Sequence, residues 1–471
     1  MKRSNWVRRG LIGVVAILGI AAVGVVSPAS TASPVVEAGT VPVMGAGGEF
    51  HAVTPARVFD SRSTDRSLDA VPYGKKPANA NGAEFTAQLA GKGGLPADPS
   101  DILAVVANVT VVEPSIGGWL AIRPAGSTAG KTALVNFAAG RNVPNLAYVG
   151  VGPAGDVTVK IRTVPNGQAH VVIDVFGWIS TTESGDRGAR LITAGPARLL
   201  DTRTSGAYLT TDESRGIQVR GASSVSPVIN PIVPASSNVT AVLVNIAAVN
   251  SYPSSRDTYL SATPSKVPAG AKSTTANLNV VAGQVKTGMA VVPIGPDGKI
   301  WIRNNFGNIH IVVDVFGYFQ ERPDETTVGR IIPLTAPFRA LDTREAAFDK
   351  VPLGTGMVED WSFKAFAESI TIPTPTGSAP VGPQSALIGN LTGTGLERLY
   401  PNVGASTYLT AYPGNVSRPL VSNLNLAEGE DVPNMSLLRY GNVGGDPYVV
   451  KTYNYYGSLH YVLDVYAVVL S

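Results

Sequence analysis

Apolar and polar residues alternate along most of the chain with a period of two, the spacing of a β-strand rather than a helix. Turn-forming residues such as Pro, Gly and Asn separate the apolar-rich runs. In the first third of the chain the runs predict about eight strands within roughly 130 residues. They lie at 55–62, 84–89, 102–112, 119–122, 133–137, 146–151, 157–161 and 171–179. This number and spacing predict an all-β fold, an antiparallel β-sandwich of the jelly-roll kind.

One short motif occurs three times, at intervals of 141 residues, which is far longer than the roughly 20–50 residues of a solenoid repeat. Its copies are Arg57-Val-Phe-Asp60-Ser-Arg62, Arg198-Leu-Leu-Asp201-Thr-Arg203 and Arg339-Ala-Leu-Asp342-Thr-Arg344. Each unit also ends on a similar strand, in which an aspartate follows a histidine. We therefore predict three tandem β-sandwich domains, called repeat 1 (49–180), repeat 2 (190–320) and repeat 3 (330–471). Because each has its own opening and closing strand, we expect each to fold alone.

The N-terminal segment has the pattern of an export signal. Basic residues between Lys2 and Arg9 precede an apolar run at 10–26, and small residues follow it. This pattern predicts a signal peptide over residues 1–32 that is removed on export. An uncleaved membrane anchor is the alternative, because about 17 apolar residues is the short limit for a spanning helix. Residues 33–48 read as a flexible lead-in to repeat 1.

Composition excludes several classes of function. The formal charge of +3 becomes −1 without the four basic residues of the leader, so a basic footprint for nucleic acid is missing. The chain has no cysteine, which excludes disulfides, thiol nucleophiles and cysteine-bound metals. Units of about 130 residues can form a core without disulfides. We expect contact with a membrane through the N-terminal segment alone, if that segment is not cleaved.

The motifs together resemble a repeat common in secreted actinobacterial proteins. The shared pattern is Pro-x-Arg-x-x-Asp-Thr-Arg, then Asn-Val-Thr, Ser-Asn-Leu-Asn and Val-Pro-Asn, and a closing Asp-Val-x-Gly-Tyr/Trp. It covers nearly all of the chain after the leader, in three copies. Repeat 2 departs from it with Lys286-Thr-Gly288, where the other repeats have Val-Pro-Asn145 and Val-Pro-Asn434. The resemblance implies an exported all-β module without an established activity.

The opening motif and the closing strand carry the polar residues that most need partners. Alternation places each histidine and the following aspartate on one face of the closing strand. We interpret each set as a structural network, in which a buried aspartate pairs with the second arginine of the motif. A catalytic or metal-binding His–Asp site is the alternative, but the sequence has no Gly-x-Ser-x-Gly elbow and offers one histidine per repeat where zinc would need three ligands. We therefore predict no catalytic residue, metal or cofactor. The network residues are Arg57, Asp60, Arg62, His170, Asp174, Arg198, Asp201, Arg203, His310, Asp314, Arg339, Asp342, Arg344, His460 and Asp464.

Three aromatic residues at equivalent places are the candidate ligand contacts. Trp119 follows two glycines at the start of a predicted strand, and Tyr259 and Tyr408 align with it. Aromatic rings at strand ends commonly line sugar or peptide sites, because their flat faces bind apolar surfaces at low entropic cost. Packing inside the sandwich is the alternative for this position.

We expect a secreted or cell-surface protein that binds or supports rather than catalyses. Its expected partner is a cell-envelope glycan or another surface protein. Three similar modules suit a weak binder, which gains avidity from repetition, better than they suit an enzyme. A secreted hydrolase that uses a His–Asp pair and a passive surface spacer are the alternatives.

Overall fold

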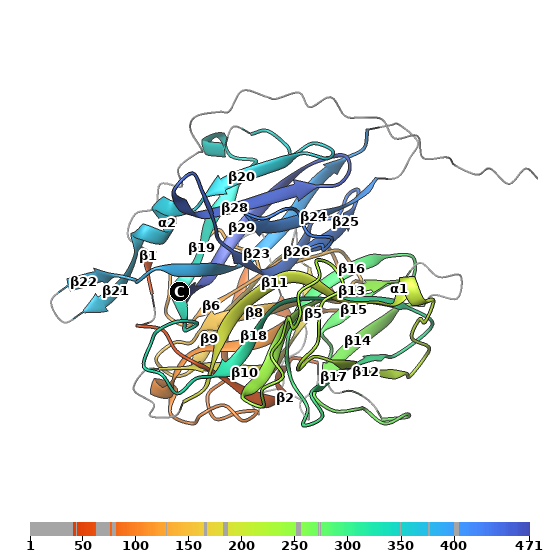
Figure 1. Ribbon diagram of the computed structural model, residues 1–471, viewed down its shortest axis with the longest axis horizontal. Coiled ribbons are helices and arrows are strands. Elements are labelled where there is room, and N and C mark those ends of the chain that lie inside the picture. Colours follow the sequence, from red (N-terminus) through yellow and green to blue (C-terminus); the bar gives the residue numbers. More distant parts are fainter. Residues whose placement is uncertain are drawn as a thin grey trace, which may run out of the picture. The chain divides into compact units, whose positions relative to one another are not determined.

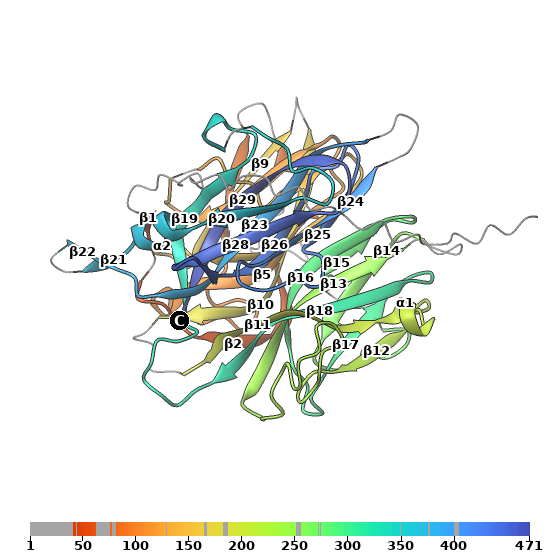
Figure 2. The same cartoon turned by 45° about the horizontal axis from the view of Figure 1, so that its top comes forward.

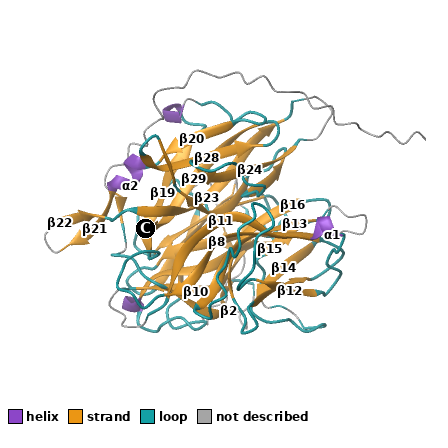
Figure 3. Cartoon of the chain, in the orientation of Figure 1, coloured by secondary structure: helices purple, strands orange, loops and turns teal. Residues whose placement is uncertain are grey.

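The computed structural model describes most of the chain, and these residues form mainly strands, joined by loops (Figure 3). The described residues are 41–43, 45–62, 76–77, 82–128, 130–163, 167–181, 187–250, 256–271, 273, 275–348, 350–374, 377–399 and 405–471. The predicted signal peptide and most of the predicted lead-in lie outside them. Helical segments are short: α1 (Thr202–Ser205), α2 (Lys364–Ser369) and the 3-10 turns Pro99–Asp101 and Ala346–Phe348.

Repeat 1 folds as two antiparallel sheets, with strand orders β2-β10-β5-β8 and β4-β9-β6-β7. We call the sheet with the first and last strands the front sheet, and the other the back sheet. The bounds are β2 (Phe50–Asp60), β4 (Ala83–Gln88), β5 (Ile102–Val112), β6 (Gly118–Pro124), β7 (Val135–Phe137), β8 (Val143–Gly150), β9 (Asp156–Thr163) and β10 (Gln168–Ser180), with β3 (Lys76–Pro77) paired to β10.

Repeat 2 has the front order β11-β18-β13-β16 and the back order β12-β17-β14-β15. Its strands are β11 (Ala189–Asp201), β12 (Ser214–Gln218), β13 (Val239–Val249), β14 (Thr258–Thr263), β15 (Leu278–Val280), β16 (Val285–Pro293), β17 (Lys299–Asn304) and β18 (His310–Glu321). The front strands of repeats 1 and 2 belong to one nine-stranded sheet, in which Ala189 pairs with Phe50. Repeat 3 has the front order β19-β29-β23-β26 and the back order β20-β28-β24-β25. Its strands are β19 (Ile331–Asp342), β20 (Val358–Ser362), β23 (Gln384–Glu397), β24 (Ser406–Pro413), β25 (Leu424–Ala427), β26 (Val432–Arg439), β27 (Gly441–Val443), β28 (Asp446–Asn454) and β29 (Ser458–Leu470).

The strand order is the same in all three repeats and is that of a jelly roll. If the eight main strands of a repeat are counted along the chain, the front sheet has the order 1-8-3-6 and the back sheet 2-7-4-5. The first and last strands are therefore neighbours at the front, as the paired opening and closing motifs predicted. The predicted all-β, jelly-roll-like fold is confirmed.

The front sheets are buried on both faces along most of their third, sixth and eighth strands, because the outer faces of these strands pack against one another. All eleven residues of β5 are buried, although a sheet with one wet face would alternate. The sixth strands β8, β16 and β26 contact one another, and β16 and β26 lie side by side in Figures 1 and 2. Residues 34–471 accordingly form one compact unit.

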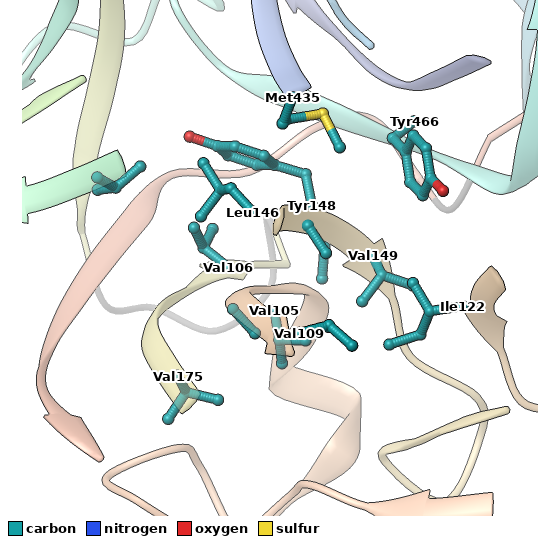
Figure 4. Close-up of a cluster of buried hydrophobic side chains, with 14 of the residues drawn as sticks. Val105, Val106, Val109, Ile122, Leu146, Tyr148, Val149, Val175, Met435 and Tyr466 are labelled. Atoms are coloured by element: carbon teal, nitrogen blue, oxygen red, sulfur yellow. The ribbon is translucent and has the colours of Figure 1, made fainter. Parts of the chain in front are cut away.

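Figure 4 shows this shared core from the side of repeat 1. Val105, Ile122 and Val175 fill the sandwich of repeat 1, whereas Tyr148 lies beside Met435 from repeat 3. One continuous cluster of buried apolar residues thus includes members from all three repeats.

The beginning of the described chain pairs with repeat 3. Strand β1 (Val41–Pro42) pairs in parallel with β21 (Ile370–Thr374), which itself pairs with β22 (Gly377–Pro380). Val43 is buried and bridges Leu334. The sequence pattern had no means of placing this partner strand, which belongs to an inserted hairpin.

Candidate functional site

Each repeat has a buried ion-pair network between its first and last strands. In repeat 1, Arg57 donates from Nε to Oδ1 of Asp174 at 2.8 Å and from Nη2 to Oδ2 at 3.2 Å. Arg57 also donates from Nη1 to Asp60 at 3.2 Å. Asp174 is 1% exposed, so the arginine supplies the partner that a buried carboxylate requires. The same pairing joins Arg198 to Asp314 and Arg339 to Asp464.

The sequence-based choice of arginine was wrong. Arg62 donates from Nε and Nη2 to the two oxygens of Asp60, at 2.9 and 2.6 Å, rather than to the aspartate of the closing strand. The cause is register, because Arg57 lies directly opposite Asp174 in the β2–β10 ladder and β2 ends at Asp60. Arg203 pairs in the same way with Asp201, and Arg344 with Asp342.

Each histidine of the closing strand contacts the hydroxyl residue of the opening motif. His310 Nδ1 lies 3.1 Å from Oγ1 of Thr202, which also accepts the backbone N–H of Ile311 at 2.9 Å. Ser61 takes the same place beside His170, and Thr343 beside His460. These hydroxyl residues were not among the predicted network residues, although each copy of the motif contains one in its Asp-Ser/Thr-Arg triplet.

The two kinds of aspartate in the network have opposite pKa shifts. Burial raises the pKa of the closing-strand carboxyl in each repeat, and that of Asp314 to about 6, although Arg198 works in the other direction. For the motif aspartate, burial also acts to raise the pKa, but the hydrogen bonds and charge of the arginines outweigh it. The pKa is therefore lowered at Asp60, Asp201 and Asp342.

Asp314 is expected to stabilise the folded unit increasingly as the pH falls from 7 to 5. Its pKa is about 6 when folded and about 3.9 when unfolded, so the folded state binds more protons between these values. The contribution is fully present below about pH 4 and is lost as the pH rises through about 6. Urea unfolding of residues 34–471 and of Asp314→Asn at pH 5 and 7 measures it. The urea midpoint of the parent chain, relative to that of Asp314→Asn, should be higher at pH 5 than at pH 7. The same difference at both pH values would contradict the raised pKa of Asp314.

Three asparagines at equivalent places form a ring of contacts where the repeats meet. Asn108, Asn245 and Asn390 are each nearly fully buried on the third strand of their repeat. Each donates from Nδ2 to a backbone carbonyl oxygen of a different repeat, so that the contacts run from repeat 1 to 2, from 2 to 3 and from 3 to 1. The acceptors are Ala276, Ser422 and Ala133, respectively.

The Val-Pro-Asn segment that repeat 2 lacks lies in strands β8 and β26, and its asparagine takes part in this ring. Asn434 donates to Oδ1 of Asn245 at 3.0 Å and accepts the backbone N–H of Met289 at 2.9 Å. Asn145 makes the equivalent contacts to repeat 3. In repeat 2 the equivalent residue is Gly288. Because glycine has no side chain, this asparagine contact is missing at one of the three junctions between repeats.

Asn434→Ala is expected to lower the free energy of unfolding by about 2–3 kcal/mol, because it leaves a buried acceptor on Asn245 and a buried donor on Met289 unpaired. The midpoint of urea unfolding of residues 34–471 measures the loss. Asn415→Ala, at an exposed site in the same repeat, should change it by less than about 0.5 kcal/mol. Equal effects of the two variants would contradict the role of the ring.

A cavity of about 840 Å³ opens at the junction of the three repeats. Trp119 of repeat 1 and Tyr259 of repeat 2, both half-buried, line it together with the exposed Phe306. The structure thus brings two of the three predicted aromatic residues into one site. We call this cavity the axial pocket. Tyr408 lies elsewhere and stacks on Tyr455, with ring centroids 4.8 Å apart.

Equivalent loops of the repeats form the wall of the axial pocket. Each turns at a glycine with positive φ: Gly140, Gly283 and Gly429. Lys286 lines the pocket where the other repeats have Val143 and Val432. Burial lowers the pKa of Lys286, partly offset by the charge of Glu430. Sequence analysis noted the departure at Lys286 but could not place it in a cavity.

The described residues contain no cluster of His, Asp and Glu arranged to hold a metal ion. Within the same residues, no helix has the length and apolar character needed to cross a membrane.

No family model matches the chain, and no curated protein sequence matches it significantly. Two solved structures of similar length align with it. One is the atomic structure of Sulfolobus turreted icosahedral virus, with 7% identity over 89% of this chain and 99% of that chain and a TM-score of 0.18. The other describes a triple jelly roll fold and turret assembly in an archaeal virus, with 8% identity over 89% and 98% and a TM-score of 0.17. Likeness at these scores carries no information about function.

Proposed function

We propose that the chain is an exported, non-enzymatic binding protein whose axial pocket holds an oligosaccharide of the cell envelope. The observation that carries this proposal is a pair of aromatic–asparagine neighbours facing one cavity. Trp119 lies opposite Asn136 in the back sheet of repeat 1, and Tyr259 lies opposite Asn279 in repeat 2. All four residues line the axial pocket.

This combination suits a sugar. The flat ring of Trp or Tyr packs against the apolar C–H face of a pyranose, and the amide of Asn can donate to and accept from adjacent hydroxyl groups. A volume of about 840 Å³ lies within the range of roughly 300–1,000 Å³ that is usual for small-molecule sites. Export and the cell-envelope address are supported by the N-terminal pattern and by the resemblance of the repeat motifs.

A hydrolase that uses the His–Asp residues has weaker support. In a catalytic His–Asp pair the carboxylate accepts a hydrogen bond from the histidine and so orients its ring. Both oxygens of Asp174 and of Asp464 already accept hydrogen bonds from an arginine, so these carboxylates are poorly suited to that role. The networks instead connect the first strand of each repeat to its last strand, as a structural ion pair does.

Trp119→Ala and Tyr259→Ala are each expected to weaken binding of cell-envelope oligosaccharides by about tenfold or more, since a buried aromatic contact commonly contributes more than about 1.4 kcal/mol. Calorimetric titration of residues 34–471 with oligosaccharides released from purified envelope polysaccharide measures the affinity. Tyr408→Ala is the matched control, because this equivalent residue lies outside the pocket, and its affinity should equal that of the parent. A passive spacer would bind none of the fractions, and that result would refute the proposal.

A further inference from the structure

A second cavity, of about 490 Å³, adjoins the axial pocket between repeats 1 and 3. Trp119, Asn136 and Asp431 line both cavities. One face of the proposed sugar site is therefore continuous with this second space, which we call the side pocket.

The side pocket is rich in positive charge. Five cationic side chains line it, against the carboxylates of Asp431 and Asp464. Three of these cations have a carboxylate partner: Arg339 pairs with Asp464, Arg344 with Asp342 and Lys160 with Glu84. The charge available to a ligand therefore comes mainly from the other two. Lys131 and Arg162 are exposed. The five cations are Lys131, Lys160, Arg162, Arg339 and Arg344.

The charge beside the aromatic ring is a property of repeat 1. Arg162 is the cross-strand neighbour of Trp119. In repeat 2 the residue hydrogen-bonded to Tyr259 across the sheet is Asn305, and in repeat 3 Tyr455 takes this place beside Tyr408. Although the strands of the three repeats share one topology, this position therefore differs in chemistry.

We infer that the side pocket binds an anionic substituent, a phosphate, sulfate or carboxylate group, of the glycan whose sugar ring lies against Trp119. The ligand class is then an acidic glycan, and the inference rests on the proposed function. A guanidinium group donates two parallel hydrogen bonds to such oxyanions, and an ammonium group adds a compact charge. Arg162 and Lys131 can approach the ligand from the repeat 1 side, whereas Arg344, which lines the pocket from repeat 3, is already paired with Asp342.

The test compares three forms of one envelope oligosaccharide fraction: native, dephosphorylated with hydrofluoric acid, and reduced at its carboxyl groups. Each is titrated into residues 34–471, into Lys131→Gln/Arg162→Gln, and into Lys266→Gln/Lys364→Gln. The last variant has the same change of charge at residues outside both pockets. We expect the native fraction to bind about tenfold more weakly to Lys131→Gln/Arg162→Gln and unchanged to the control. If the dephosphorylated fraction loses affinity, the group is a phosphate, and if the carboxyl-reduced fraction loses affinity, it is a carboxylate. If neither fraction loses affinity but binding still depends on Lys131 and Arg162, the group is a sulfate.

Two results separate failure of this inference from failure of the proposed function. If all three fractions bind equally to the parent and to Lys131→Gln/Arg162→Gln, and Trp119→Ala abolishes that binding, the glycan site stands and the anionic subsite is refuted. Inorganic phosphate at constant ionic strength is the second probe. The second result is that phosphate raises the melting temperature of the parent but not of Lys131→Gln/Arg162→Gln, while the affinity for every oligosaccharide fraction is unchanged by Trp119→Ala. In that case the anion site stands and the glycan function is refuted.

Discussion

Asp314→Ala is expected to lower the free energy of unfolding of residues 34–471 by about 3–5 kcal/mol, which is the usual cost of stranding one member of a buried ion pair. Arg198 would keep its contact with Asp201 but lose the bidentate partner that lies opposite it on β18. The midpoint of urea unfolding, followed by circular dichroism, measures the loss.

Arg203→Ala is the matched control within the same network. The side chain of Arg203 is 48% exposed, so its pair with Asp201 should contribute no more than about 1 kcal/mol. If Arg203→Ala costs as much as Asp314→Ala, the assignment of Arg198 as the essential partner is wrong. If Asp314→Ala has the same urea midpoint as the parent chain, the network does not stabilise the fold.

Repeat 2 expressed alone, as residues 190–320, is expected to associate or precipitate rather than to remain a folded monomer. Its front sheet would expose apolar residues that the other repeats now cover, such as Leu243, Met289 and Val291. Arg190, which is 1% exposed and binds Glu49 and Asp324 at 2.8 and 2.7 Å, would lose both partners. Apolar patches of this kind drive association, so the structure argues against the sequence-based expectation of independent folding.

Analytical ultracentrifugation of residues 190–320 and 34–471 checks this prediction. The longer chain should be monomeric at concentrations at which the single repeat is not. Leu243→Thr/Val291→Thr in the isolated repeat places hydroxyl groups on the exposed face and should restore a soluble monomer. A monomeric, cooperatively folded parent repeat would show that its own sandwich core suffices.

The local sequence determined the strands and their grouping. Period-two alternation, turn residues and three copies of one motif predicted three jelly rolls, because strand formation and burial of one face depend on nearby residues. The motif also identified the network residues, since a buried aspartate must have a cationic partner. It did not identify which arginine fills that role.

Tertiary structure decided the pairings and the site. The register shift between Ile173 and Asp174 places Arg57 opposite Asp174, where an unbroken ladder would place Val58, and alternation alone cannot count such an irregularity. Because both faces of β5 are buried, its sequence is apolar apart from Asn108 and Thr110, which predicts a buried strand without naming what covers it. Trp119 and Tyr259 are far apart along the chain and meet in one cavity because the three front sheets pack together. Contacts between surfaces of separate sandwiches leave no periodic signal within either one, so the pocket could be found only in three dimensions.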